Sequence, residues 1–354
     1  MSDSQKLNSG TTDVREPYRF DEGRLHAWMQ DNVQDFAGPL TVTQFKGGQS
    51  NPTYKLSTPG ASYVLRRKPP GATVKGAHAV DREARIQSAL VDTGVPVSRV
   101  HGLCTDDTVI GSWFYVMDFV EGRIIWDATF PDVPREQRPA YYDEMNRVIS
   151  TLHNLDVEQL GLADFGKAGN YFERQINRWS RQYEADAVAG TNEHLDRLIE
   201  WLPQNISQDE SVSISHGDFR VDNMIFHPTE PRVLAVLDWE LSTIGHPIAD
   251  FTYHAMMYRM PPIMITGLEG QDLPALNIPS EESYIAQYCQ RTGRGNIPDL
   301  HFYFAFNMFR LAAIVHGIKA RSLRGTASSA HAEKLVASLP LLARRAWEIA
   351  QKQA

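Results

Sequence analysis

The sequence predicts an α+β protein with two lobes, in which a small antiparallel β-sheet precedes a larger and mainly helical lobe. A length of 354 residues is too long for one small core and fits two lobes at the usual ~100 to 200 residues per domain. Short apolar runs separated by Gly- and Pro-containing turns come first in the chain, as in antiparallel sheets. Beyond them, apolar residues recur at helical spacing over long segments.

These patterns divide the chain into three parts. Residues 1–20 are rich in Ser, Thr, Asp and Gly, which predicts a flexible leader. Residues 21–121 form the expected sheet lobe and residues 122–354 the expected helical lobe. The boundary follows an apolar strand at the Glu121-Gly122 turn.

The expected elements follow from the same periodicities. The first lobe should contain strands at 40–45 and 62–66 on either side of a Gly-rich turn and a middle strand within 47–54, a helix at 78–90, and a buried strand at 113–120. Helices are expected in the second lobe at 137–155, 172–187, 192–202, 248–257, 280–291, 299–320 and 331–353. A hairpin with strands at 224–226 and 233–237 interrupts this series.

The hairpin region carries the most informative residues. Asp218 follows His216-Gly217, and Asn223 comes after four intervening residues, the interval between the base and a metal ligand in a kinase catalytic loop. Asp238 ends the second strand, so the hairpin should return it beside Asn223. This arrangement indicates phosphoryl-transfer chemistry.

Moving the terminal phosphoryl group of a nucleoside triphosphate requires a carboxylate beside the attacking hydroxyl and oxygen ligands that hold Mg²⁺. We predict that Asp218 is the catalytic carboxylate and that Asn223 and Asp238 bind Mg²⁺. The alternative is that all three residues only form turns, as Asp and Asn commonly do. The combined interval, hairpin and strand end favour the catalytic interpretation.

At the segment HGDFRVDNMIFHPTEPRVLAVLDWELSTIGHPIAD the sequence resembles the aminoglycoside and choline phosphotransferase family, which has a protein-kinase-like fold. Within that family it resembles the kinase-like domains associated with acyl-CoA dehydrogenases, over about residues 35 to 345. The resemblance implies Mg²⁺-dependent transfer from ATP or GTP to a hydroxyl of a small molecule, such as a hydroxyacyl-CoA. If a protein with this domain is called an acyl-CoA dehydrogenase, the name would describe a neighbouring domain, because nothing in this sequence indicates a flavin site.

Residues of the first lobe are expected to bind the nucleotide. Gly47, Gly48 and Ser50 would form the turn over the phosphates, although a plain hairpin turn explains the glycines nearly as well. The backbone of Met117, Asp118 and Val120 would meet the base at the connection between the lobes, where burial in a strand explains the apolar side chains equally well.

The family usually has a phosphate-binding Lys where this sequence has Arg66. Strand alternation puts Arg66 and Arg67 on opposite faces, and we favour Arg66 for the nucleotide side. Glu83, on the following helix, is its expected partner, and the alternative for Glu83 is an ordinary exposed helix charge.

Composition limits the partners and the compartment. A net charge of −8 argues against a nucleic-acid-binding surface. Two cysteines, no signal-peptide pattern and no apolar run of membrane-spanning length predict a cytoplasmic protein without membrane contact. The sequence leaves open the acceptor, the choice of nucleotide and the oligomeric state.

Two further functions stay open at this stage. One is a scaffold that binds nucleotide but catalyses no transfer, which is compatible with Arg66 at the position where the family usually has Lys. An antibiotic kinase acting on aminoglycosides would require an acidic acceptor pocket.

Overall fold

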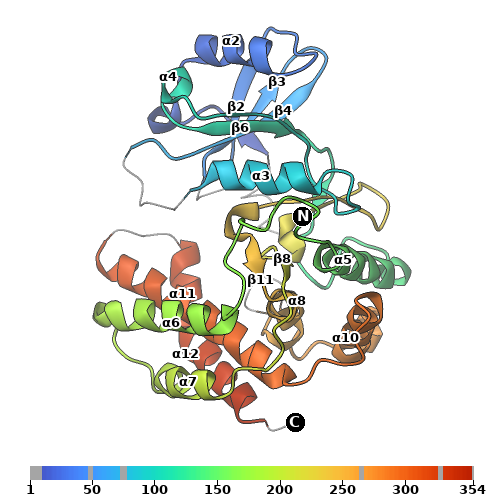
Figure 1. Cartoon of the computed structure of the whole chain (residues 1–354), viewed down its shortest axis with the longest axis vertical. Helices are drawn as coiled ribbons and strands as arrows, with labels where there is room; N and C mark the ends of the chain where they lie inside the picture. Colours follow the sequence, from blue (N-terminus) through green and yellow to red (C-terminus); the bar gives the residue numbers. More distant parts are fainter. Residues whose placement is uncertain (1–9, 47–50, 72–77, 263–266, 326–329, 353–354) are drawn as a thin grey trace.

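The computed structural model describes residues 10–46, 51–71, 78–262, 267–325 and 330–352. A six-stranded antiparallel sheet with its helices forms one lobe, and a mainly helical second lobe lies beneath it (Figure 1). The predicted α+β arrangement with two lobes is therefore confirmed.

The sheet of the first lobe has the strand order β1-β2-β3-β4-β6-β5. Its strands are β1 (Thr11–Thr12), β2 (Thr41–Phe45), β3 (Thr53–Ser57), β4 (Ser62–Arg67), β5 (Val100–Cys104) and β6 (Phe114–Asp118). Helices α2 (Glu22–Asn32) and α4 (Asp107–Ile110) share a buried apolar cluster with one face of the sheet. Helix α3 (Val80–Leu90) shares a second cluster with the opposite face.

The described part of the predicted leader is attached to this sheet. Strand β1 pairs with β2, with Thr11 opposite Phe45. The carbonyl of Tyr18 accepts a hydrogen bond from the hydroxyl of Tyr54 at 2.9 Å. Residues from 10 to 20 therefore extend the sheet lobe.

The second lobe is built from helices around one large apolar core. They are α5 (Arg138–His153), α6 (Tyr171–Ala185), α7 (Glu193–Gln204), α8 (Pro247–Ala255), α9 (Leu273–Leu276), α10 (Glu281–Arg291), α11 (Leu300–Leu323) and α12 (Ala330–Ala350). Buried side chains of α11 such as Phe302, Phe306 and Phe309 lie at the centre of this core. No described helix combines the length and apolar character needed to cross a bilayer.

Two small sheets position the loop that carries Asp218. Strands β9 (Met224–Phe226) and β10 (Val233–Val236) pair antiparallel, which confirms the predicted hairpin, and β7 (Arg123–Ile124) pairs with β9. Strands β8 (Ser213–Ser215) and β11 (Thr243–Gly245) form the other sheet. The loop therefore starts at the end of β8 and ends where β9 begins.

Helix α3 joins the two lobes. Its Ile86 and Leu90 belong to the core of the helical lobe, whereas its Val80 and Ala84 pack against the first sheet. The Arg82 guanidinium also donates to the carbonyl of Phe165 at 2.6 Å. Figure 1 shows α3 between the sheet and the helices below it.

Candidate active site

The loop after β8 is held by a buried carboxylate. Both oxygens of Asp250, in the first turn of α8, accept backbone N–H groups, from His216 at 2.7 Å and from Gly217 at 2.8 Å. Burial alone would raise the pKa of Asp250, but the hydrogen bond and charge of His153, with the other nearby donors, lower it overall. Asp250 is therefore a charged anchor for the loop backbone.

Gly217 is required at the tightest point of this loop. Its φ is +83°, and a Cβ there would lie 2.7 Å from the carbonyl oxygen of Leu241. Any other residue would combine a strained left-handed conformation with a steric clash. The glycine thus lets the chain turn directly into Asp218.

The Asp218 carboxylate accepts hydrogen bonds on both oxygens. Asn223 Nδ2 donates to Oδ2 at 2.9 Å, and the Tyr253 hydroxyl donates to Oδ1 at 2.7 Å. The Arg220 Nε lies 3.6 Å from Oδ1. These contacts fix the orientation of the carboxylate.

The structure brings Asn223 and the strand end before Asp238 together. The N–H of Leu237 donates to the carbonyl of Asn223 at 2.8 Å, so the hairpin returns the chain as its pattern predicts. Asp238 then adopts a left-handed backbone with φ of 64°, at the start of the 3₁₀ turn η5 (Trp239–Leu241). Asp tolerates this conformation better than most residues.

The donor set at Asn223 and Asp238 fits Mg²⁺, which prefers oxygen ligands. The Asn223 amide nitrogen donates to the carbonyl and carboxylate of Asp218, which leaves its oxygen for a cation. Asp238 Oδ1 meets the Arg66 guanidinium at 2.6 Å. Among the described residues, no group of three or more His, Cys, Asp or Glu side chains is arranged to hold a metal ion.

Arg66 links the two lobes through carboxylates. Its guanidinium lies 2.6 Å from Glu83, 2.6 Å from Asp238 and 3.6 Å from Glu240. Burial opposes a charge on Arg66, but Glu83 and Asp238 outweigh it and raise the pKa of the guanidinium. Arg66 therefore faces the catalytic loop from the sheet above it.

Arg67 has the opposite orientation, as strand alternation predicts. Its Nε donates to the hydroxyl of Ser112 at 2.8 Å, and its guanidinium lies 5.4 Å from the ring centre of Phe20. The contacts of Arg67 are thus within the first lobe.

Glu83 is a buried positioning residue. It is 1% exposed and accepts hydrogen bonds from Asn51 Nδ2 at 2.7 Å and the Tyr115 hydroxyl at 3.1 Å. The alternative of an exposed helix charge is therefore wrong. Glu83 contacts Arg66 directly, at 2.6 Å.

The other predicted nucleotide residues are less fully described. Gly47, Gly48 and Ser50 lie outside the described residues. Met117 and Asp118 end strand β6, where the N–H of Asp118 donates to the carbonyl of Arg99 at 2.9 Å and its carboxylate meets His101 at 2.7 Å. That N–H is therefore already paired.

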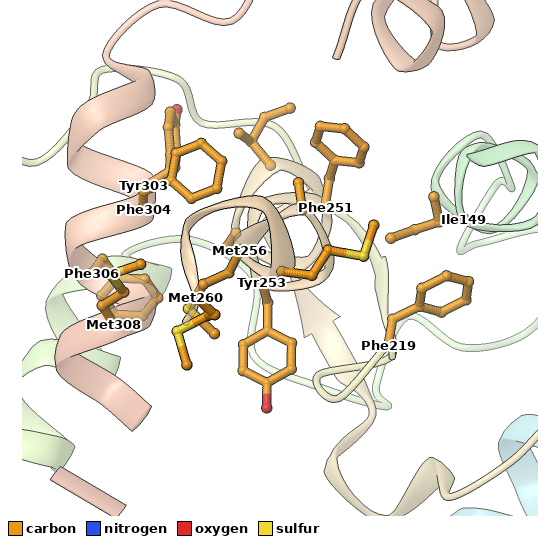
Figure 2. Packing of buried hydrophobic residues seen from close by; sticks show 14 of the residues in the cluster. Ile149, Phe219, Phe251, Tyr253, Met256, Met260, Tyr303, Phe304, Phe306 and Met308 are labelled. Carbon is orange, nitrogen blue, oxygen red and sulfur yellow. The ribbon is translucent and has the colours of Figure 1, made fainter. Parts of the chain in front are cut away.

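A cavity of about 320 Å³ opens beside Asp218. Its wall is mainly apolar and comes from the loop that carries Asp218, η5, α8, the following turn η6 (Met256–Arg259) with Met260, α11 and α12. The lining residues are Asp218, Arg220, Val221, Leu241, Tyr253, His254, Met256, Met257, Met260, Arg310, Leu311, Ile314, Val315, Ile318 and Leu335. Figure 2 shows Tyr253, Met256 and Met260 beside the helix that carries Phe306 and Met308. Asp218 is the sole carboxylate among these lining residues.

Sequence reasoning missed several residues that the structure places around this site. Tyr253 holds Asp218, and Asn51 and Tyr115 hold Glu83. These contacts join segments that are distant in the sequence, so no local pattern predicts them. Among the basic residues of α11, only Arg310 lines the cavity, within the described lining.

The two-lobed fold and the spacing of Asp218, Asn223 and Asp238 are those expected of a kinase-like phosphotransferase family. The model of the phosphotransferase enzyme family matches residues 41–292, and the chain belongs to this family.

Similar proteins agree with this assignment. A crystal structure of a Ralstonia eutropha protein, provisionally named an aminoglycoside phosphotransferase, superposes with a TM-score of 0.87 at 51% identity, covering 95% of this chain and 100% of that one. Acyl-CoA dehydrogenase family member 10 of Mus musculus is 43% identical over 89% of this chain and 30% of its own length. Family member 11 of Gallus gallus is 41% identical over 98% and 45%. The chain thus spans less than half of these curated relatives.

Proposed function

We propose that the protein transfers the γ-phosphoryl group of ATP or GTP to a hydroxyl group of a small molecule. The observation that carries this proposal is the Asp218 carboxylate, which is oriented by Asn223 and Tyr253 and lines a mainly apolar cavity. The carboxylate lies where an acceptor hydroxyl can donate its proton.

The residues take the following roles in this reaction. The acceptor oxygen bonds to the γ-phosphorus, the bond to the bridging oxygen breaks, and the nucleoside diphosphate leaves. Asp218 accepts or orients the hydroxyl proton. Arg220, 3.6 Å from Asp218, would face the negative charge that is transferred.

On the nucleotide side, Arg66 would bind phosphate oxygens and Glu83 would position it. Asn223 and Asp238 would hold Mg²⁺, which neutralises phosphate charge when bound. Gly47, Gly48 and Ser50 would cover the phosphates, and the backbone near Met117, Asp118 and Val120 would meet the base. Of these last, Asp118 would offer its carbonyl, because its N–H is paired.

The cavity supports an acyl-type acceptor. Methionine and aliphatic side chains form most of its wall, and a volume of about 320 Å³ suits a short acyl chain rather than a whole coenzyme A thioester. The acceptor would then be a hydroxylated acyl compound, with any coenzyme A portion outside the cavity. The relatives' association with acyl-CoA dehydrogenases is consistent with this class.

The same cavity opposes an aminoglycoside acceptor. Aminoglycosides are polycations, and their recognition requires several carboxylates. The described lining offers Asp218 alone and two arginines.

A screen of ATP and GTP consumption with Mg²⁺ tests the proposal. The acceptors are alcohols, amino alcohols, aminoglycosides and hydroxyacyl-CoAs, each with the wild type and with Asp238→Ala. We expect a hydroxylated acyl compound to stimulate consumption in the wild type only. Binding of nucleotide without consumption under any condition would instead show a scaffold.

A further inference from the structure

Arg310, on α11, places a buried positive charge in the wall of the cavity. The residue is 8% exposed. One terminal nitrogen donates to the carbonyl of Gly217 at 2.8 Å, directly before Asp218. Its Nε is buried and has no hydrogen-bond partner among the described residues, and none of their carboxylates forms an ion pair with it.

The other basic groups of the cavity are compensated or neutral. Arg220 donates to Asp222 at 2.9 Å and lies 3.6 Å from Asp218. Burial lowers the pKa of His254 to about 4, so its imidazole is neutral near pH 7. Arg310 therefore differs from the rest of the described lining in carrying a charge that no protein carboxylate balances.

The surroundings of Arg310 compensate this charge only in part. Its guanidinium lies 5.0 Å from the ring centre of Tyr253 and 5.9 Å from that of Trp179. Aromatic faces attract a guanidinium, but more weakly than a hydrogen-bonded carboxylate does. An unpaired buried charge is costly, so a ligand anion that reaches it binds favourably.

Arg310 is also close to the chemistry. Tyr253, against which it packs, donates to Asp218 Oδ1 at 2.7 Å. An anion held by Arg310 would thus lie near the acceptor hydroxyl, with the apolar wall beyond it to receive a hydrocarbon chain.

We propose that Arg310 is a specificity-determining residue that binds a carboxylate of the acceptor, close to the hydroxyl that receives the phosphoryl group. The acceptor class is then a hydroxy carboxylic acid with an apolar chain. A free hydroxy acid supplies this carboxylate, whereas a coenzyme A thioester presents a neutral carbonyl at that place. The inference rests on the proposed function, which it makes more specific.

Steady-state kinetics with paired acceptors test the inference. Hydroxydecanoates with the hydroxyl on different carbons are compared with the matched neutral decanediols, using wild type, Arg310→Gln and Arg310→Lys. Arg324→Gln is the matched control, because it removes the same charge from the end of the same helix, where Arg324 pairs with Asp186 outside the cavity.

We expect the wild type to prefer the acids, and Arg310→Gln to lower kcat/KM for them about 10- to 100-fold, mainly through KM. The diols should respond little, Arg310→Lys should keep part of the preference, and Arg324→Gln should resemble the wild type. Equal use of acids and diols by the wild type would overturn the inference. An equal fall in kcat for acids and diols in Arg310→Gln would also overturn it, because that result would show that Arg310 only holds the backbone at Gly217.

Calorimetric binding of decanoate and decanol separates this inference from the proposed function. Decanoate binding that Arg310→Gln weakens, in a protein that phosphorylates no acceptor, would support the carboxylate site and refute the kinase. If Arg310→Gln does not fold, the inference is tested by the wild type and Arg310→Lys. The wild type should bind decanoate more tightly than decanol, and Arg310→Lys should reduce this difference. Equal binding of decanoate and decanol by the wild type would refute the carboxylate site whether or not turnover occurs.

Discussion

The two sides of the catalytic loop balance charge in different ways. On the nucleotide side, Arg66 lies 2.6 Å from both Glu83 and Asp238. On the acceptor side, Arg310 has no carboxylate partner among the described residues, and it lines a cavity whose wall is formed mainly by aliphatic side chains and methionines. A charged group that is paired within the protein is held in position before a ligand binds, whereas an unpaired charged group gains its counter-charge from the ligand. In the proposed function, the residues that bind the nucleotide would thus be in place before it binds, whereas the charge of Arg310 would be paired only when the acceptor binds.

Removing the group between the two sides should have the largest effect. Asp218→Asn keeps the shape of the side chain but removes the charge that accepts the proton. We expect kcat to fall on the order of 10² to 10⁴-fold, with nucleotide affinity nearly unchanged. Rapid-quench measurement of product formation checks this, and wild-type-like turnover would exclude Asp218 as the catalytic carboxylate.

Substitution of Glu83 tests the paired charges around Arg66. Glu83→Gln removes the buried partner of Arg66, so we expect a loss of about 3 kcal/mol of unfolding free energy. The kcat/KM for nucleotide should fall about 10-fold or more, because Arg66 loses its position. Denaturant titration and kinetics measure both changes.

The matched control for Glu83 is Asp81→Asn on the same helix. Asp81 is more exposed and lies 3.9 Å from Lys68, so its removal should change stability by less than about 1 kcal/mol. If both substitutions had equal effects, the buried network around Arg66 would not matter for stability.

The helical lobe should lose stability in acid through two buried neutral histidines, of which His254 lines the cavity. Burial lowers the pKa of His246 and of His254 from 6.5 to about 4. The unfolded chain therefore binds more protons between pH 6.5 and 4. The stabilising contribution of each histidine is present above pH 6.5 and is lost as the pH falls through 4, by at most about 3 kcal/mol each.

Urea titrations from pH 7 to pH 4 measure this loss. In His254→Gln, which keeps a hydrogen-bonding side chain near the Tyr284 hydroxyl, the decline with falling pH should be shallower. An identical decline in wild type and variant would show that His254 is already protonated or exposed in the folded protein.

The smallest effect is expected in the apolar wall. Met260→Leu nearly conserves side-chain volume, so stability should change by less than about 1.5 kcal/mol. KM for acyl acceptors should change a few-fold because a stiffer side chain replaces an adaptable one. Kinetics over a series of chain lengths check this, and a loss of all activity would mean that the wall has a more specific role.

Much of the fold and of the catalytic loop could be predicted because the signals are local. The spacing of Asp218 and Asn223 and the hairpin before Asp238 are sequence patterns, and alternation in β4 separates Arg66 from Arg67. Strands β7, β8 and β11 were not predicted because each has only two or three residues and, unlike β9 in its hairpin, pairs with a strand distant in the sequence.

The acceptor side could not be predicted in the same way. Arg310 stands in the sequence among other basic residues of α11, and only its place in the described cavity wall distinguishes it. His316 and Lys319 bind the carbonyls of Gly190 and Ala189 at 2.8 and 2.7 Å, and Arg324 pairs with Asp186. Such partners come from distant segments of the chain, so tertiary structure is needed to identify them.

The central claim is that the Asp218 loop transfers a phosphoryl group to a hydroxyl group. Phosphorus NMR of a reaction with ATP, Mg²⁺ and the hydroxydecanoate set tests it most directly. The account predicts a phosphomonoester signal that forms in step with ADP in the wild type and is absent in Asp218→Asn. ADP with only inorganic phosphate, or an ester signal that persists in Asp218→Asn, would contradict it.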